Sequence, residues 1–172
     1  MKGHAVTAPL TFDPIEEAAR QWRAHGWDDA ADGMAAVTSL MRAQAIMLGR
    51  AEAILRPLGL SFARYELLTL LSFTQRGTLP MARAVALLQV HPTSVTNAVQ
   101  RLEKAGLVRR EPHPGDGRAA LIQITAGGRE LAAEATKHLN ADLFTQPGLP
   151  DDGLRTLFSV IRDLRRDAGD FA

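Results

Sequence analysis

The 172-residue sequence predicts a mainly α-helical fold that carries one small β-hairpin. Apolar residues recur at helical spacing along most of the chain, and capping residues precede several of these stretches. Two short β-type stretches flank the turn-rich segment PHPGDG at residues 112–117. Because two strands cannot form a core alone, the hairpin must lean on the helices. This order of elements predicts a winged helix-turn-helix flanked by helical arms.

Two helices are expected in the amino-terminal part. Asp13 as N-cap, followed by Pro14 in the first helical position, starts a helix that stops near residue 26. A longer helix starts at residue 32 or 33 and reaches residue 56, where proline and glycine residues end it. Its apolar residues cover more than one face, which indicates burial on several sides. In a small protein, such a helix predicts a subunit interface.

The middle of the chain is expected to hold three shorter helices and the hairpin. Ser61 caps the first of these helices, which has regularly spaced apolar residues. A short helix over 80–88 and a tight connection lead to a further helix within 91–107. The two strands are expected over 107–111 and 120–124.

Two more helices are expected after the hairpin. Thr125 caps a long helix that reaches about Phe144, and a segment rich in proline and glycine then breaks the chain. Asp151 or Asp152 starts the last helix. Its apolar stripe consists of Leu154, Leu157, Phe158, Ile161 and Leu164.

The helix that starts at Pro92, with His91 as its N-cap, has two different faces. By helical spacing, one face is apolar and consists of Val95, Val99, Leu102 and Ala105, with Ala98 beside them. The candidate DNA contacts on this helix are Pro92, Thr93, Ser94, Thr96, Asn97, Gln100, Arg101 and Lys104. Short polar side chains in the first turns suit base edges in a major groove, and the later cations suit phosphates. The alternative is the solvated face of an ordinary surface helix.

The hairpin contributes the other candidate DNA contacts, Arg109, Arg110, Asp116 and Arg118. An arginine on an exposed wing can enter an adjacent minor groove. Asp116 is expected to hold the Arg118 guanidinium in one rotamer. The alternative is a plain hairpin that carries solvated charges.

Charge is distributed unevenly, although the net charge is only +1. Residues 76–118 carry seven cations and three acids, whereas the segments on either side carry slightly more acids than cations. A basic middle segment, which also contains the candidate helix and hairpin, is typical of a protein that meets a polyanion. Chance is the alternative explanation for so small a bias.

Several classes of function find no support in the sequence. There is no cysteine, which excludes a disulfide framework, a cysteine-ligated zinc site and a thiol redox switch. The five histidines are scattered, so we expect no metal site and no cofactor. No nucleophile elbow, phosphate-binding loop or paired His/Glu helix is found, so an enzyme is not expected. Because no apolar run could span a membrane and the start lacks a secretory signal, we expect a cytoplasmic protein with no membrane partner.

Three segments resemble the MarR family of bacterial transcriptional regulators. Asp116-Gly117-Arg118, followed by Ile124-Thr125 and Gly128, is similar to the wing signature D-x-R…[LI]-T-x-x-G. The segment RLEKAGLVRR at 101–110 resembles the R-L-E-x-x-G-L-[IV]-x-R stretch, and residues 59–68 match a weaker third piece. The three segments occur in the right order and spacing, and the resemblance covers roughly residues 35–145.

This resemblance implies a homodimer that binds double-stranded DNA through one winged helix per subunit. It implies dimerisation helices at residues 1–58 and 126–172 and a DNA-binding lobe at 59–125. A two-fold dimer predicts a pseudo-palindromic operator whose half-sites lie about 10 bp apart. Members of the family usually repress, and often release DNA when a small molecule binds between the lobe and the dimer arm.

The resemblance also suggests an effector site, because the extra helix at residues 13–24 is similar to that of the urate-responsive branch. Trp22 would then correspond to the tryptophan of that branch and Glu66 to its acid, although Glu stands where Asp is usual. A small aromatic or carboxylate ligand would fit such a site. The alternative is that Trp22 and Trp27 only pack the extra helix on the dimer.

Two other kinds of function remain open. A winged helix can serve as a protein-interaction module without specific DNA readout, and a steep fall of DNA affinity with salt would separate the two functions. A non-specific architectural DNA-binding protein depends mainly on phosphate neutralisation, which the modest net charge disfavours.

Overall fold

The computed structural model of the chain describes residues 9–113 and 116–172, with the side chains of residues 113–119 outside the description. The chain forms two compact units, residues 1–49 and 50–172. In the described ranges, no helix has both the length and the apolar character that a membrane span requires.

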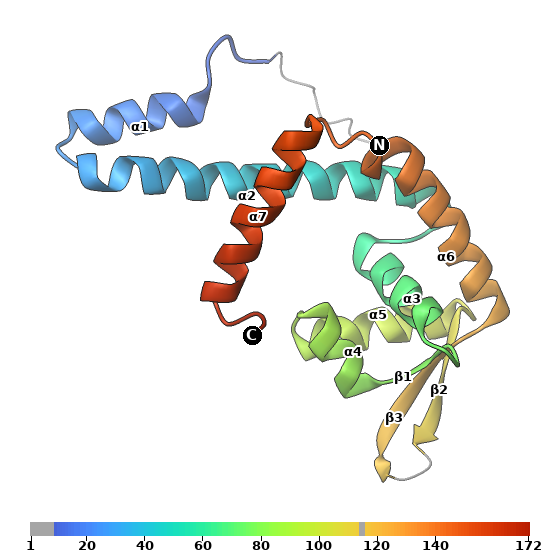
Figure 1. Cartoon of the computed structure of the whole chain (residues 1–172). Helices are drawn as coiled ribbons and strands as arrows, with labels where there is room; N and C mark the ends of the chain where they lie inside the picture. The colour runs from blue at the N-terminus through green and yellow to red at the C-terminus, as the bar shows by residue number, and fades with distance from the viewer. Residues whose placement is uncertain (1–8, 114–115) are drawn as a thin grey trace. The chain divides into compact units, whose positions relative to one another are not determined.

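The first unit consists of α1 (Pro14–Ala24) and most of α2 (Asp28–Leu55) (Figure 1). The Asp13 carboxylate accepts a hydrogen bond from the Ile15 N–H at 2.7 Å, which confirms the predicted N-cap. The predicted start of α2 at residue 32 or 33 is wrong, since the helix begins at Asp28. Two acidic residues in its first turn favour the earlier start, and a glycine inside a helix costs only about 1 kcal/mol.

The second unit contains three short helices of a helix-turn-helix lobe, a sheet and the carboxyl-terminal helices (Figure 1). After the end of α2, its elements are η1 (Arg56–Leu58), α3 (Phe62–Phe73), β1 (Thr78–Pro80), α4 (Met81–Leu88), α5 (Pro92–Lys104), β2 (Val108–His113), β3 (Asp116–Ile124), α6 (Ala126–Leu139), η2 (Asn140–Phe144) and α7 (Asp151–Asp167). The mainly α-helical winged helix-turn-helix fold that the sequence predicts is thereby confirmed.

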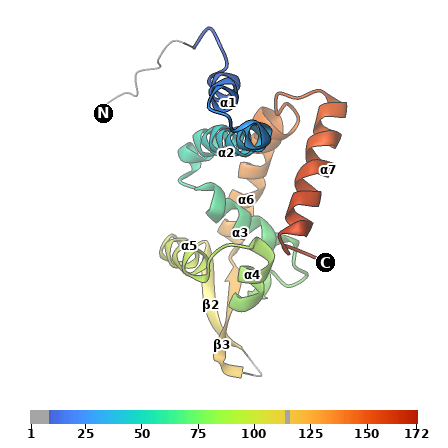
Figure 2. The same cartoon turned by 90° about the vertical axis from the view of Figure 1, so that its left-hand side faces the viewer.

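The sheet has three strands rather than the predicted two. Its strand order is β1-β3-β2, and both pairs of neighbours are antiparallel. In the register, Thr78 lies opposite Gln123, and Val108 lies opposite Ile124. The strand β1 has only three residues and pairs with a segment far along the chain, so local sequence patterns did not indicate it. Figure 2 shows the β2–β3 hairpin extending beyond α4 and α5.

A single core holds the lobe together, with α3 at its centre. The α3 helix packs on α4, α5, α6 and β3. The largest fully buried side chains are Leu55, Leu67, Leu68, Leu71, Val95, Val99, Leu102, Ile122 and Leu139. Burial of each such side chain stabilises the fold by about 1.5–3 kcal/mol, so this core fixes α5 and the hairpin against one body.

The start of α6 joins the end of α5 to the hairpin. The Thr125 hydroxyl accepts a hydrogen bond from the Gly128 N–H at 3.1 Å, which confirms the predicted cap of α6. The same hydroxyl donates to the Gly106 carbonyl oxygen at 2.9 Å. At Gly128, a Cβ atom would overlap the carbonyl oxygen of Leu107, so only glycine lets the helix approach this closely.

The carboxyl-terminal helices follow the predicted bounds. The segment from Ala126 to Phe144 is helical throughout, but its last five residues form the π-helix η2. The last helix, α7, starts at Asp151 as predicted. None of the described residues of α7 is buried, although the helix is strongly amphipathic, and the Phe158 side chain is 67% exposed.

Candidate nucleic-acid interface

The helix α5 separates an apolar face from a polar one, as the sequence predicts. Its apolar residues Val95, Ala98, Val99 and Leu102 are all buried in the lobe. The predicted fifth member, Ala105, is exposed and forms the C-cap, because the helix ends one residue earlier. The core therefore fixes the rotation of α5 about its axis and decides which side chains face outward.

The first turn of α5 is capped and exposed. His91 is the N-cap, and its ring nitrogen Nδ1 accepts a hydrogen bond from the Thr93 N–H at 3.2 Å. Pro92 occupies the first helical position, where the absence of an N–H costs nothing. Both Thr93 and Ser94 are exposed. These short side chains leave room for close approach of another molecule to the backbone.

The amides follow on the same outward face. Asn97 and Gln100 are exposed, and neither side chain forms a hydrogen bond with another described residue. Thr96 is half-buried, and its hydroxyl donates to the Pro92 carbonyl oxygen at 3.0 Å. Thr96 therefore presents its methyl group and an oxygen lone pair rather than a free donor.

The cations lie at the far end of α5 and on the hairpin. Arg101 and Lys104 are exposed in the last turns of the helix. On β2, Arg110 forms an ion pair with Glu103 of α5, with 3.4 Å between Nε and Oε2. This ion pair joins the hairpin to the helix. It also means that the Arg110 guanidinium already has an acidic partner.

Arg109 lies on the opposite face of β2 from Arg110. Its Nε donates to the Gln123 amide oxygen at 2.6 Å and lies 3.1 Å from a carboxylate oxygen of Glu111. Its side chain is nevertheless largely exposed. The two other predicted contacts, Asp116 and Arg118, belong to β3, but their side chains lie outside the described part of the structure. Their roles stay predictions.

The two residues of the predicted effector site belong to different units. In the first unit, the partly exposed Trp22 contacts Trp27 edge to face, with 5.4 Å between the ring centroids. In the second unit, Glu66 is half-buried on α3, and burial raises the pKa of its carboxyl by desolvation. Their participation in one ligand site stays a prediction.

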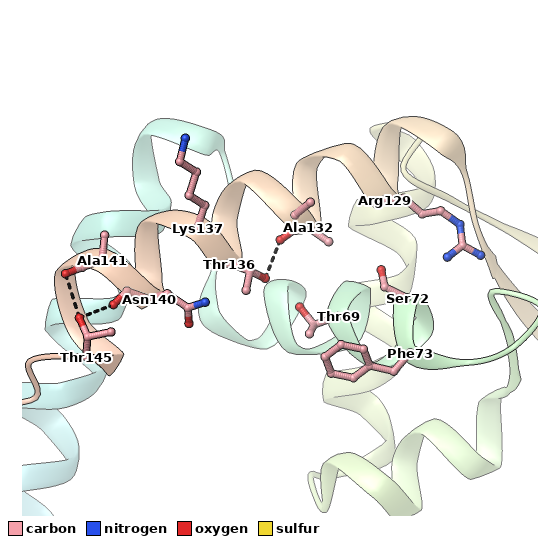
Figure 3. Close-up of a pocket in the computed structure, with 11 residues that line it drawn as sticks. Thr69, Ser72, Phe73, Arg129, Ala132, Thr136, Lys137, Asn140, Ala141 and Thr145 are labelled. Carbon is pink, nitrogen blue, oxygen red and sulfur yellow. Dashed lines mark hydrogen bonds between the residues drawn. The ribbon is translucent and has the colours of Figure 1, made fainter. Parts of the chain in front are cut away.

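A cavity between α3 and α6 was not predicted from the sequence. It has a volume of about 780 Å³ (Figure 3). Its lining is mostly apolar or small and consists of Thr69, Ser72, Phe73, Arg129, Ala132, Ala133, Thr136, Lys137, Asn140, Ala141 and Thr145. The run of small residues on α6 was its only signal in the sequence, and that signal is weak because such runs also form ordinary close packing.

Some polar groups of this cavity have hydrogen-bond partners, and one buried hydroxyl has none among the described residues. The Thr136 hydroxyl donates to the Ala132 carbonyl oxygen at 2.7 Å and lies 3.1 Å from the Tyr65 hydroxyl. The Thr69 hydroxyl points toward α6 in Figure 3. It is buried and has no hydrogen-bond partner among the described residues. Buried polar groups are normally satisfied, so this hydroxyl could serve a bound molecule.

The described residues offer no constellation for metal binding. No group of three or more His, Asp or Glu side chains within 9–112 and 120–172 is placed to hold an ion. What these ranges do present is an outward-facing set of hydroxyl, amide and cationic groups on α5, beside a hairpin strand, β2, that carries Arg109 and Arg110. Such groups can form hydrogen bonds with base edges and with phosphates.

Comparisons with known proteins agree with this geometry. The sequence profile described as MarR family matches residues 58–119. A solved structure of Sco5413, a MarR family transcriptional regulator from Streptomyces coelicolor, is 47% identical. The comparison covers 81% of this chain and 97% of that one, with a TM-score of 0.75.

Curated relatives carry related descriptions. An HTH-type transcriptional repressor of Mycobacterium bovis is 33% identical over 96 residues, which are 56% of this chain and 68% of the relative. An uncharacterised HTH-type transcriptional regulator of Mycobacterium leprae is 37% identical over 82 residues, which are 48% of this chain and 52% of the relative. This chain thus spans about half the length of the first curated relatives that it matches. From the identity, the coverage and the shared winged helix-turn-helix, the chain belongs to the MarR family of transcriptional regulators.

Proposed function

We propose that this regulator binds a pseudo-palindromic double-stranded operator as a homodimer and represses transcription from it. The observation that carries the proposal is the outward face of α5, whose hydroxyl and amide groups are exposed while the opposite face is buried in the core. A relative with 33% identity is named as a transcriptional repressor, which supports repression rather than activation.

Each part of α5 has a chemical role in this proposal. Asn97 and Gln100 can each form two hydrogen bonds with adenine, and the threonine methyl groups can contact the methyl of thymine. Arg101 and Lys104 bind phosphates and set the register of the helix on the duplex. Pro92, Thr93 and Ser94 bring the helix start close to the bases, and the helix N-terminus itself favours a phosphate.

The hairpin is proposed to contact the neighbouring minor groove. Arg118, oriented by Asp116, would enter that groove, where a narrow width concentrates negative potential. Arg109 and Arg110 would contact phosphates at its edges. Since both already face acidic residues, they contribute only part of their charge to the duplex. We therefore expect Arg118 to matter more for affinity than either of them.

Homodimer formation is proposed from the apolar surfaces that a single chain leaves exposed. In the first unit, exposed apolar side chains on α2 include Val37, Met41 and Ile46. In the second unit, those on α7 include Leu157, Phe158, Val160 and Leu164. Large exposed apolar faces normally mark interaction sites. We assign residues 1–58 and 126–172 to the dimer arm and 59–125 to the DNA-binding lobe.

We also propose that a small aromatic or carboxylate molecule releases the DNA. The cavity between α3 and α6 has the size and the apolar lining of an ordinary ligand pocket. An aromatic ring would pack against Phe73 and the alanines of α6, and a carboxylate would accept hydrogen bonds from Thr69 or Arg129. Trp22 and Glu66 are retained as a second candidate site for the same class of ligand.

Selection of bound sequences from a random duplex pool with the purified protein tests the DNA proposal. We expect an enriched motif with two inverted half-sites about 10 bp apart and an affinity that falls steeply with salt. A double variant, Asn97→Ala with Gln100→Ala, is expected to lose the enrichment while keeping the fold. If no sequence is enriched and affinity is insensitive to salt, the winged helix serves as a protein-interaction module instead.

Titration of the selected complex with aromatic carboxylates and urate tests the effector proposal. Ala133→Phe should fill the cavity and abolish release, whereas Glu134→Phe adds the same ring at the next, non-lining position and should not. Loss of response in Trp22→Ala or Glu66→Gln, with Ala133→Phe unaffected, would move the site to the second candidate. If none of these ligands releases the DNA from the unaltered protein, the effector proposal is withdrawn.

A further inference from the structure

The turn between α4 and α5 contains an unusual backbone conformation. Gln89 is the C-cap of α4, and its φ of 52° and ψ of 39° lie in the left-handed region. Among the described residues other than glycine, Gln89 alone has a positive φ. Glycine adopts this conformation without the steric cost that a side chain brings. A glutamine here carries a steric cost, which contacts of its side chain can offset.

The side-chain amide of Gln89 is hydrogen-bonded at both ends, to a residue in the last turn of α7 and to a residue that follows the helix. Its Nε2 donates to the Asp170 carbonyl oxygen at 2.5 Å, and its Oε1 accepts from Arg165 Nη2 at 3.2 Å. Arg165 and Asp170 are in turn paired with each other, with 2.5 Å between Nε and Oδ2. The three residues form a closed ring of hydrogen bonds, which we call the Gln89 latch.

Further contacts hold the latch in place. The guanidinium carbons of Arg165 and Arg166 each lie 5.5 Å from the centroid of the Phe171 ring, a cation–π distance. The Asp170 side chain is only 23% exposed, whereas that of Arg165 is 48% exposed, so their ion pair is partly shielded from solvent. The latch thus ties the end of α7 to the lobe by interactions that reinforce one another.

The position of the latch bears directly on α5. Gln89 lies two residues before His91, the N-cap of α5. The first turn of α5 carries Thr93 and Ser94, which the proposed function places against the bases. Any change of backbone direction at residue 89 would therefore shift those side chains relative to the rest of the lobe.

We propose that Gln89, held by Arg165 and Asp170, is a positioning residue for the recognition helix. The inference rests on the proposed function, because it concerns how α5 is aimed at DNA. It assigns to the segment 165–171 a role in DNA affinity without any contact to the duplex. The latch transmits the placement of α7 to the turn between α4 and α5.

A double-mutant cycle on the full chain tests the latch. Arg165→Gln removes the ion pair and the donor to Gln89, and Gln89→Gly removes the amide and relieves the backbone strain. Each is expected to weaken binding of the selected duplex roughly 3- to 10-fold, the size of one or two hydrogen bonds. The two effects should not add, since both variants open the same ring. Arg155→Gln is the matched control, because it removes the same charge from α7 and no described residue pairs with Arg155.

Amide hydrogen exchange without DNA provides a second readout that is specific to the turn. In Arg165→Gln, the N–H groups of residues 89–95 should exchange faster, with the unfolding temperature and the dimer unchanged. The latch is overturned if exchange in this segment stays as in the unaltered protein, or if the duplex is bound equally well. If the unaltered protein selects no duplex, the proposed function fails, and the exchange measurement alone then decides on the latch.

Discussion

The helices α5 and α7 are both strongly amphipathic, yet the apolar face is buried in α5 and exposed in α7. In α5, the apolar residues Val95, Ala98, Val99 and Leu102 are buried in the lobe, and the polar face is exposed. In α7, none of the described residues is buried, and apolar side chains such as Phe158 are largely exposed. Amphipathicity alone therefore does not say what a helix does.

The two helices therefore expose two kinds of surface, a polar one on α5 and an apolar one on α7. The polar face of α5 is stable in water, so it gains from a partner only through specific hydrogen bonds and charge. The apolar face of α7 is unfavourable in water, so it gains from any partner that covers it. We infer that contact with DNA at α5 is reversible and selective, whereas contact with a second subunit at α7 is lasting.

The largest effect is expected from charging the apolar face of α7. Leu157→Asp combined with Phe158→Asp removes four side chains that the proposed two-fold dimer would bury, each worth about 1.5 kcal/mol or more. The dimer should weaken by a factor on the order of 10⁴, as measured by sedimentation equilibrium. Thr156→Asp on the opposite face is the control. A dimer that survives the double variant would assign the interface to other helices.

The next effect compares matched leucines on the two helices. Leu102→Ala should lower the free energy of unfolding by about 2–5 kcal/mol, because it leaves a cavity in the core. Denaturant titration should give the same loss at every protein concentration. Leu157→Ala should instead make the transition midpoint more dependent on concentration. If both variants behave alike, the contrast between a filled and an unfilled apolar face is wrong.

A smaller and selective effect is expected on the polar face of α5. Asn97→Ala should reduce discrimination at one base pair by about 1–3 kcal/mol, because a two-bond contact with adenine is lost. Binding to duplexes that differ only at that base pair measures the change. The fold should be unaffected, since the Asn97 side chain has no hydrogen-bond partner in the described chain. An equal loss for all duplexes would place Asn97 on the phosphate backbone.

The smallest effect concerns Glu66, a polar residue that is neither fully exposed like the outward face of α5 nor fully buried. Its pKa is raised above 4.5 by desolvation, so the folded state favours the protonated form. Its contribution to stability is present below pH 4.5 and is lost as the pH rises through the raised pKa. Glu66→Gln should therefore be slightly more stable than the unaltered protein at neutral pH, and the difference should vanish in acid. Thermal unfolding across pH measures this, and an unchanged difference would contradict it.

Local signals in the sequence predicted much of the fold. Asp13, Ser61, His91 and Thr125 all act as helix caps where their residue types and neighbours indicated them. Capping depends on a few adjacent residues, so it can be recognised without the tertiary structure. The buried face of α5 followed for the same reason, because helical periodicity is local.

Features that depend on distant pairing were not predictable. The strand β1 exists because Thr78–Pro80 meets residues 121–123. The cavity arises where α3 faces α6, more than fifty residues further along the chain. The Gln89 latch likewise joins segments that are 76 and 81 residues apart. None of these features leaves a periodic pattern in its own segment.

The outward side chains of α5 form few contacts with the rest of the lobe, so they can be changed without disturbing the core. Residues 93, 94, 97 and 100 could be exchanged as a cassette, while the buried quartet of α5 keeps the scaffold intact. A library randomised at these four positions should yield folded proteins with altered operator preferences. The DNA specificity of α5 can then be changed without changing the residues that stabilise the fold.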